Sequence, residues 1–264
     1  MGDVAVGRVA AAALCAALLG AGCGERAEPV ERAAVVYPLT VGGVTLPDAP
    51  REVVALGGSA MVSLLERLGV EPVRTSAPDL LLAWADEAGA DLDPEGPAYF
   101  APDATLDELE RSIATVGLLV NRPGQAREVV AEIRADRADG RRLAAGKPRV
   151  RVFVDLGFFA TAGERTLVGD IVREAGGVNV AGPTPEPGPF PLDQLAAADP
   201  EVYVISSESR TTRAFLLANP LTRRLAAVRD DRVVVVPAER LKPGPRSGAG
   251  VLALATALHG HAAR

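Results

Sequence analysis

Few residues in this 264-residue chain have the types and spacing that catalysis requires. The run Gly57-Gly58-Ser59-Ala60-Met61 partly matches a nucleophile elbow, but Met61 replaces the second glycine of that motif. No histidine lies in the body of the chain to act as a base, because His259 and His261 stand at the extreme C-terminus, on a tail that we expect to fray. Acid pairs such as Asp86-Glu87 are typical of solvated loops. We therefore expect no enzymatic activity and no catalytic residue.

Composition also disfavours metal and nucleic-acid binding. The two cysteines, Cys15 and Cys23, lie in the N-terminal segment, so the expected folded body has no disulfide and no cysteine metal site. Zinc and manganese sites normally take several histidine or carboxylate ligands, and both histidines are terminal. A net charge of −6 without a basic block disfavours nucleic acid as a partner. We expect no resident metal ion and no cofactor.

Cys23 ends a segment with the layout of a secretory signal. Arg8 precedes an apolar run over 9–19, and Gly20-Ala21-Gly22 follows that run. The run is shorter than the ~20 apolar residues of a permanent membrane-spanning helix. A cysteine directly after Ala-Gly resembles a bacterial lipobox. That resemblance implies removal of a signal peptide over 1–22, lipidation of Cys23, and an extracytoplasmic protein anchored to the cell membrane. The alternative is a plain secretory signal with an incidental cysteine.

Beyond a polar tether over 23–36, patterns typical of strands and helices alternate. Two short β runs around Gly42-Gly43 predict a hairpin. Thr105-Leu106-Asp107-Glu108 is a capping box, which marks the start of a helix. Further elements of this part are expected as strands over 52–56, 71–74, 79–83 and 98–101, and as helices over 59–68 and 105–117. The 79–83 segment could instead open a helix that runs to Gly89.

A long polar helix is expected over 125–145. Its apolar stripe is clear only in the first half, at Ala126, Val129, Val130 and Ile133. The second half is dominated by arginine and aspartate. At 1.5 Å per residue the helix would be about 32 Å long. A helix that is amphipathic in one half and solvated in the other suits a rod between two bodies better than a core helix.

A second alternating series follows this helix. Its expected elements are strands over 150–155, 202–205 and 233–236, and helices over 167–175, 192–198, 212–228 (in pieces) and 245–259. Two such series predict an α/β fold with two lobes, each with a central, mainly parallel sheet flanked by helices, around a cleft. We place the N-terminal lobe at 37–120, one long bridging helix at 121–146 and the C-terminal lobe at 147–264.

Six strings of the sequence resemble one family, the periplasmic-binding-protein-like proteins that deliver cobalamin, iron–siderophores and haem to ABC importers. The strings are Leu46–Leu56, Pro78–Trp84, Gly146–Val152, Ala175–Val180, Leu192–Val202 and Pro243–Arg246. The resemblance implies two lobes joined by one long helix, a monomer, and a groove between the lobes that holds a metal chelate. It also implies that ligand binding moves the lobes little and that an ABC permease is the partner.

The sequence departs from this family in the N-terminal lobe. The link over 75–77 has three residues, where the family has a longer segment with a helix and a groove-lining loop. That segment also carries a glutamate thought to pair with arginine on the permease, so we expect a shortened lobe without this docking acid. In the C-terminal lobe the matching acidic position falls on Asp193, which we take as the permease-docking residue.

Candidate ligand contacts follow from the chemistry of such chelates, which have flat apolar faces and anionic edges and so need aromatic side chains and arginine. Phe158 and Phe159 stand on the loop after the first strand of the C-terminal lobe, where binding residues commonly collect. Phe190 ends a proline-rich loop, and Arg246 precedes the last helix at a ligand-facing position in relatives. The alternatives are core packing for one phenylalanine, loop packing for Phe190 and a surface charge for Arg246.

The N-terminal lobe offers three further candidates. Trp84 follows a leucine-rich strand, and Tyr99 alternates with Phe100 on a short strand, so one of that pair should face the cleft or solvent. Ser59 opens a helix where free amides and a hydroxyl could hold an anion. Core packing for Trp84 and a simple N-cap for Ser59 remain alternatives. Weaker candidates are Tyr37, Arg165 and Arg240.

The predicted function is an extracytoplasmic, lipid-anchored solute-binding protein that captures a metal chelate for an ABC importer. The alternative is a surface lipoprotein of the same fold that has lost permease coupling and acts as a sensor or interaction module.

Overall fold

The computed structural model describes residues 35–85, 94–183 and 188–260. All of them belong to one compact unit. The expected signal peptide, most of the tether and Cys23 lie outside the described residues, as does His261. Within those ranges, no helix combines the length and the apolar character that crossing a bilayer requires.

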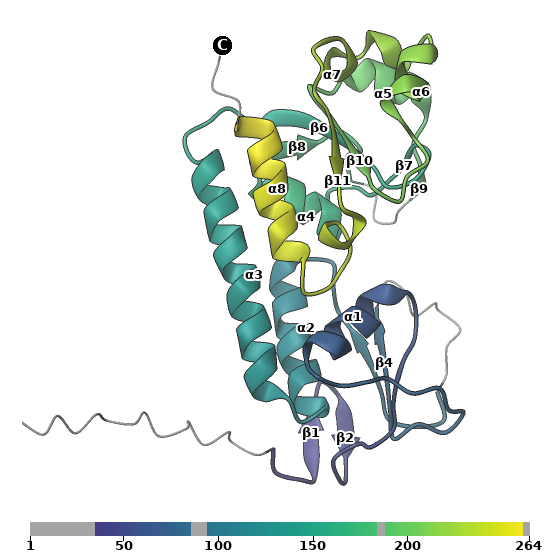
Figure 1. Cartoon of the computed structure of the whole chain (residues 1–264), viewed down its shortest axis with the longest axis vertical. Coiled ribbons are helices and arrows are strands. Elements are labelled where there is room, and N and C mark those ends of the chain that lie inside the picture. The colour runs from purple at the N-terminus through teal and green to yellow at the C-terminus, as the bar shows by residue number, and fades with distance from the viewer. Residues whose placement is uncertain (1–34, 86–93, 184–187, 261–264) are drawn as a thin grey trace, which may run out of the picture. The chain divides into compact units, whose positions relative to one another are not determined.

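A small parallel sheet in the order β3–β4–β5 organises the N-terminal part (Figure 1). The elements of this part are β1 (Leu39–Val41), β2 (Val44–Leu46), β3 (Val53–Ala55), α1 (Ser59–Arg67), β4 (Leu80–Trp84), β5 (Ala98–Ala101) and α2 (Leu106–Leu119). β1 and β2 form the predicted antiparallel hairpin. Its turn requires glycine, because Gly42 and Gly43 have φ angles of 59° and 80°.

One predicted strand of this part is not formed. Val73 donates a backbone hydrogen bond to Val53 of β3 (2.9 Å), but Pro72 lacks an N–H, so no ladder develops over 71–74. The 79–83 segment is strand β4 and not the start of a helix. The threonine half of the predicted capping box is confirmed, since the Thr105 hydroxyl accepts a hydrogen bond from the amide of Glu108 (3.1 Å).

A second parallel sheet, in the order β11–β10–β6–β8, organises the C-terminal part. The strands and helices of this part are β6 (Val150–Asp155), β7 (Ala160–Thr161), α4 (Leu167–Glu174), β8 (Gly177–Asn179), β9 (Gly188–Pro189), α5 (Leu192–Ala198), β10 (Val202–Ser206), α6 (Arg213–Ala218), η1 (Thr222–Arg224), α7 (Ala226–Arg229), β11 (Val233–Val236), η2 (Ala238–Arg240) and α8 (Ser247–His259). The sequence did not predict β7, β8 or β9, which are only two or three residues long and carry too little pattern.

The two central strands of this sheet, β6 and β10, are buried on both faces and are almost continuously apolar. Val152 and Val154 of β6 face the larger hydrophobic core together with α4 and α8. Phe153 points the opposite way, into a second core with α5, α6 and α7. Tyr203 of β10 pairs in register with Phe153 and shares that second core.

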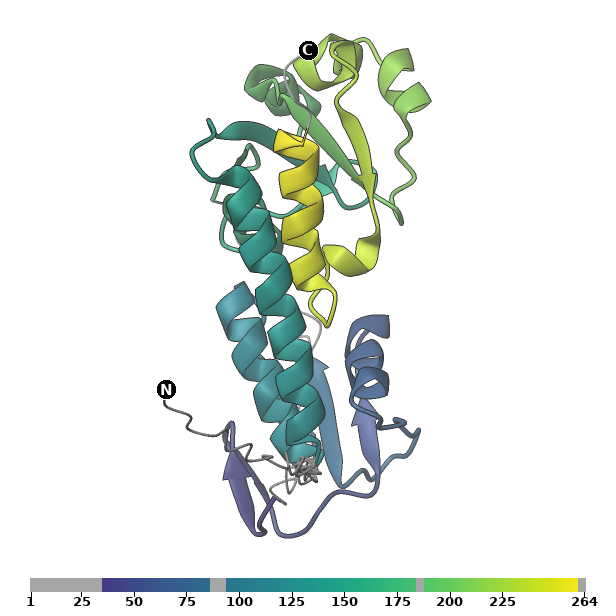
Figure 2. The same cartoon turned by 60° about the vertical axis from the view of Figure 1, so that its left-hand side comes forward.

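The long helix α3 (Pro123–Ala144) bridges the two parts as predicted, but the expectation that its second half is wholly solvated is wrong. Figure 1 and Figure 2 show α3 beside α2 for one part of its length and beside α8 for the other. Its buried stripe continues beyond Ile133 at helical spacing, through Arg137 and Gly140. Neither of these two residues is apolar in a hydropathy pattern, which is why the second half seemed solvated.

Backbone-to-backbone packing holds α3 against α8. A Cβ atom on Gly140 would lie 2.9 Å from the carbonyl carbon of Val251, and one on Gly248 would lie 2.6 Å from the carbonyl oxygen of Ile133. Such distances leave no room for a side chain, so glycine at both positions sets the separation of the two helices.

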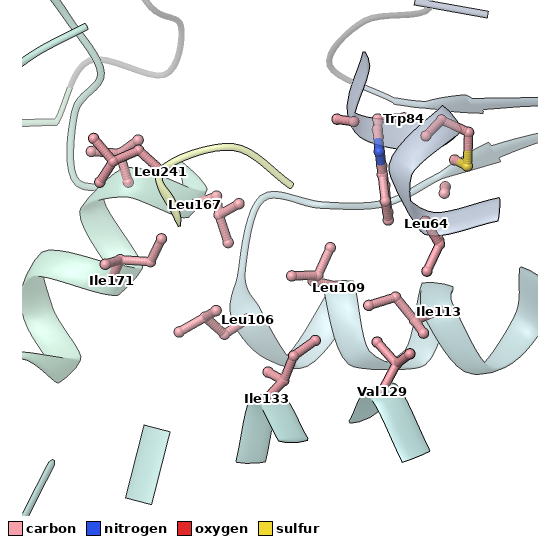
Figure 3. Close-up of a cluster of buried hydrophobic side chains, with 14 of the residues drawn as sticks. Leu64, Trp84, Leu106, Leu109, Ile113, Val129, Ile133, Leu167, Ile171 and Leu241 are labelled. Carbon is pink, nitrogen blue, oxygen red and sulfur yellow. The ribbon is translucent and has the colours of Figure 1, made fainter. Parts of the chain in front are cut away.

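One continuous core links the two sheets. Figure 3 shows Leu64 and Trp84 at one end of the cluster, and Ile171 and Leu241 at the other. Side chains of α2 and α3, such as Leu109, fill the space between them. The two parts are therefore connected by shared packing and not only by the chain of α3.

A buried ion-pair network crosses the same junction. Arg137 of α3 is only 5% exposed. Its guanidinium donates to Glu174 of α4 at 3.0 and 2.6 Å, to Asp107 of α2 at 2.8 Å, and to Glu110 of α2. Burial alone would lower the pKa of Arg137, but hydrogen bonds to the three carboxylates outweigh burial and raise it. The arginine therefore stays charged and fastens three helices together.

We expect Arg137→Met to destabilise the protein by about 3–5 kcal/mol, because removal of one partner leaves buried carboxylates without a counter-charge. The measurement is urea-induced unfolding followed by circular dichroism. Arg142→Met is the matched control, since the Arg142–Asp139 pair lies on the surface of the same helix and such pairs contribute about 0–1 kcal/mol. Equal losses for the two variants would contradict a structural role for the buried network.

Candidate ligand-binding groove

A cavity of about 500 Å³ opens where the two sheets face each other. The N-terminal part contributes Ala85, just after β4, and Ala104, just before α2. The C-terminal part contributes Leu156 and Ser206, at the carboxyl ends of β6 and β10, and Leu241 after β11. Ligands of open α/β sheets commonly bind at the carboxyl ends of the strands.

Charged groups also surround this cavity. Arg165 and Lys242 bring positive charge to its wall, and Asp103 and Glu208 bring negative charge. The first turn of α4, at Thr166–Val168, lines the same wall, and the N-terminus of a helix favours anions. A lining that combines apolar side chains with Arg165 suits a ligand that has both an apolar face and an anionic group.

Two further cavities adjoin the first at Glu208. One, of about 260 Å³, also includes Lys242, and the other, of about 490 Å³, includes Phe158 and Arg210. The Lys242 ammonium donates to the Glu208 carboxylate at 2.6 Å. We refer to the three cavities together as the groove, with the Glu208–Lys242 ion pair at their junction. Glu208 was not among the residues predicted from the sequence, although its place after the buried strand β10 was a usable signal.

Two predicted site residues line the cavity of about 260 Å³. Ser59 of the N-terminal part and Arg246 of the C-terminal part both line it, and both are exposed. Gly58 is the N-cap of α1, so the alternative of Ser59 as N-cap is wrong. Arg165, a weaker candidate from the sequence, lines the main cavity.

Phe158 and Phe159 differ in exposure although their rings are in contact, with centroids 5.8 Å apart. Phe158 is 60% exposed and lines the groove, whereas Phe159 is 7% exposed and packs in the second core. Their φ angles are 48° and 66°, a left-handed conformation that bulky residues rarely adopt. Each such residue costs roughly 1–3 kcal/mol, and this kind of strain gathers at functional sites.

Phe190 packs away from the groove. Its ring lies on Phe153 with centroids 5.5 Å apart, and its half-buried side chain joins the second core. The expectation of ligand contact is therefore not met, because the aromatic stack over β6 holds the ring.

Trp84 and Tyr99 are core residues, so the expectation that they contact a ligand is wrong. Trp84 is fully buried on β4, in a strand whose two faces are covered. The Tyr99 ring packs beside the hairpin, where it leaves no space for a Cβ on Gly42, and its hydroxyl lies 3.5 Å from Ser112 Oγ. Tyr37 likewise packs against the large core.

The expectation that His259 lies on a frayed tail is wrong, because His259 is the last residue of α8. Its half-buried imidazole lies so close to Gly176 that a Cβ there would meet Nε2 at 2.6 Å. Burial, with a smaller contribution from Lys147, lowers the pKa of His259.

Asp193 is exposed in the first turn of α5, and its docking role remains a prediction. In the ranges that the structure describes, no three His, Cys, Asp or Glu side chains gather to hold a metal ion.

Two curated proteins are similar to this chain in sequence. A cobalamin-binding protein from two strains of Halobacterium salinarum is 27% identical over 235 residues, which cover 82% of this chain. The chain spans 62% of the length of these curated relatives.

Two solved structures share the fold. A periplasmic binding protein from Veillonella parvula superposes with a TM-score of 0.71 at 18% identity, over 86% of this chain and 99% of that chain. The periplasmic vitamin B12 binding protein of Vibrio cholerae gives 0.63 at 19% identity, over 79% and 96% of the two chains. The family described as periplasmic binding protein matches residues 46–240. The chain belongs to this periplasmic binding protein family, whose members bind ligands and do not transform them.

Proposed function

We propose that this protein captures a metal chelate outside the cytoplasmic membrane and delivers it to an ABC importer. The observation that carries the proposal is the groove, which lies at the carboxyl ends of strands from both sheets and combines apolar lining with Arg165, Lys242 and an exposed Phe158. The main cavity, at about 500 Å³, has the size of a small-molecule site, for which ~300–1,000 Å³ is usual.

Corrinoids are the first ligand class to test, with haem and ferric siderophores as the other members of the proposed class. The curated relative named for cobalamin binding supports this order. The physical support is the mixture of surfaces. Leu156 and Leu241 can cover an apolar face of the ligand, and Arg165 can pair with an anionic substituent at its edge.

Membrane attachment and docking are separate parts of the proposal. Lipidation of Cys23 would tether the protein to the membrane. Asp193 would meet a basic group on the permease, and its exposed position in the first turn of α5 is compatible with that contact. The short link over 75–77 leaves the N-terminal part without a matching acid.

A thermal-shift screen with cyanocobalamin, haemin and a ferric hydroxamate tests the ligand class. At a hundred times its dissociation constant, a ligand that binds only the native state stabilises it by about 2.7 kcal/mol, which raises Tm by roughly 5–10 °C for a chain of this size. We expect one of the three chelates to produce such a shift. No shift with any of them would refute the proposed class.

A charge substitution tests the groove itself. We expect Arg165→Gln to weaken binding of an anionic chelate by roughly 10- to 150-fold, because hydrogen bonds to charged groups contribute about 1.5–3 kcal/mol. Arg223→Gln is the control, since Arg223 is an exposed arginine of the same part of the chain that does not line the groove. Isothermal titration calorimetry of both variants measures the effect, and equal affinities would place the ligand elsewhere.

The second candidate function is a surface protein that kept the fold but lost transport coupling, acting as a sensor or interaction module. The missing docking acid of the N-terminal part favours it. Uptake of a labelled chelate by cells that lack the gene, complemented with wild type or Asp193→Asn, separates the two functions. Transport coupling predicts that Asp193→Asn lowers uptake while the purified variant keeps its affinity. Uptake that does not depend on the gene, despite chelate binding by the purified protein, would instead support the second function.

A further inference from the structure

Asp155 ends strand β6 with a fully buried carboxylate. Three donors converge on it: the Tyr203 hydroxyl at 2.7 Å, the Ser209 hydroxyl at 3.0 Å and the amide of Phe159 at 3.2 Å. Tyr203 lies inside the second core, whereas Ser209 and Phe159 belong to the loops that follow β10 and β6. The carboxylate therefore connects a fixed point of the core to two loops of the groove.

Ser209 extends this connection. Its hydroxyl oxygen donates to Asp155 and accepts from the amides of Phe158 (3.2 Å) and Thr211 (3.1 Å). The serine thus uses its one donor and both acceptor positions within the network. The two loops are fastened to each other as well as to the strand.

The network explains how two consecutive phenylalanines keep a left-handed backbone. Residues in such conformations persist only where the surrounding structure fixes them. Here the amide of Phe158 is held by Ser209 and the amide of Phe159 by Asp155. This conformation sends the Phe159 ring into the core and leaves the Phe158 ring at the groove, on the rings of Phe159 and Phe215 with centroids 5.8 and 5.5 Å apart.

Glu208, the residue before Ser209, lines all three cavities of the groove. We propose that Asp155 is a positioning residue for ligand binding, which holds Phe158 and Glu208 in place through Ser209 without touching the ligand. The proposal rests on the proposed function only in taking the groove as the binding site. Preorganised loops lose less freedom when a ligand binds, which favours affinity.

Four variants of the full chain separate this role from general stability. Asp155→Ala removes both loop contacts, and Ser209→Ala removes the link at a half-buried position where folding is less at risk. Asp155→Asn keeps an acceptor oxygen for the loops and should restore the wild-type behaviour. Tyr203→Phe removes one hydrogen bond from the same carboxylate without touching either loop.

Amide hydrogen exchange is measured first, with no ligand present. We expect the amides of 157–160 and 207–211 to exchange roughly tenfold faster in Asp155→Ala and Ser209→Ala, but not in Asp155→Asn or Tyr203→Phe. Faster exchange spread over the whole C-terminal sheet, or unchanged exchange of Phe158 in Ser209→Ala, would overturn the proposal. If Asp155→Ala does not fold, Ser209→Ala and Tyr203→Phe still decide the question.

Cyanocobalamin affinity is measured next. We expect Ser209→Ala to weaken binding roughly tenfold in the wild-type background and to have little further effect when Phe158→Ala is already present, because contacts that act through one another are not additive. Full additivity of the two substitutions would overturn a role through Phe158. If the wild type does not bind cyanocobalamin, the corrinoid assignment fails, and the exchange experiment still decides whether Asp155 positions the loops.

Discussion

The structure depends on one buried guanidinium. A charged arginine inside a protein is tolerated only if its donors are matched by acceptors, and Arg137 meets that requirement with carboxylates from two neighbouring helices. α2 belongs to the part around the first sheet and α4 to the part around the second, so satisfying Arg137 fixes one part relative to the other. Asp170 of α4 adds a second link, because its carboxylate accepts the amide hydrogen of Leu106 at the start of α2 (2.9 Å).

Rigidity at this junction has a direct consequence for the groove. Both helices that meet at Arg137 begin at the wall of the main cavity, α2 just after Ala104 and α4 just after Thr166. The continuous core and the close contact of α3 with α8 oppose any change in their separation. A ligand that binds in the groove as proposed would find its width already set, and adaptation would be left to side chains such as the exposed Glu208–Lys242 pair.

The sequence predicted the elements whose patterns are local. Continuous apolar runs predicted the buried parallel strands. The Thr105 cap predicted the start of a helix, and Gly69 and Gly176 predicted the ends of two others. These two glycines have φ angles of 72° and 82°. The role of α3 could not be read locally, because Arg137 and Gly140 are buried by a charge network and by backbone contact and not by hydrophobicity. The residues that line the groove were harder still to predict from the sequence. Whether an aromatic residue such as Trp84 faces a core or a cleft depends on which helices cover its sheet, and that is decided by tertiary packing.

The two parts contribute unequally to the lining of the groove. From the N-terminal part the groove receives mostly small side chains, such as Ala85, Ala104 and Ser59. The larger cationic and aromatic groups, including Arg165 and Phe158, come from loops of the C-terminal part. Small residues opposite large ones leave room for a bulky ligand, but they supply little contact area of their own. If the groove binds the ligand as proposed, affinity comes mainly from C-terminal loops that are already ordered. The hydrogen bonds that fix those loops then matter for recognition as much as the side chains that touch the ligand.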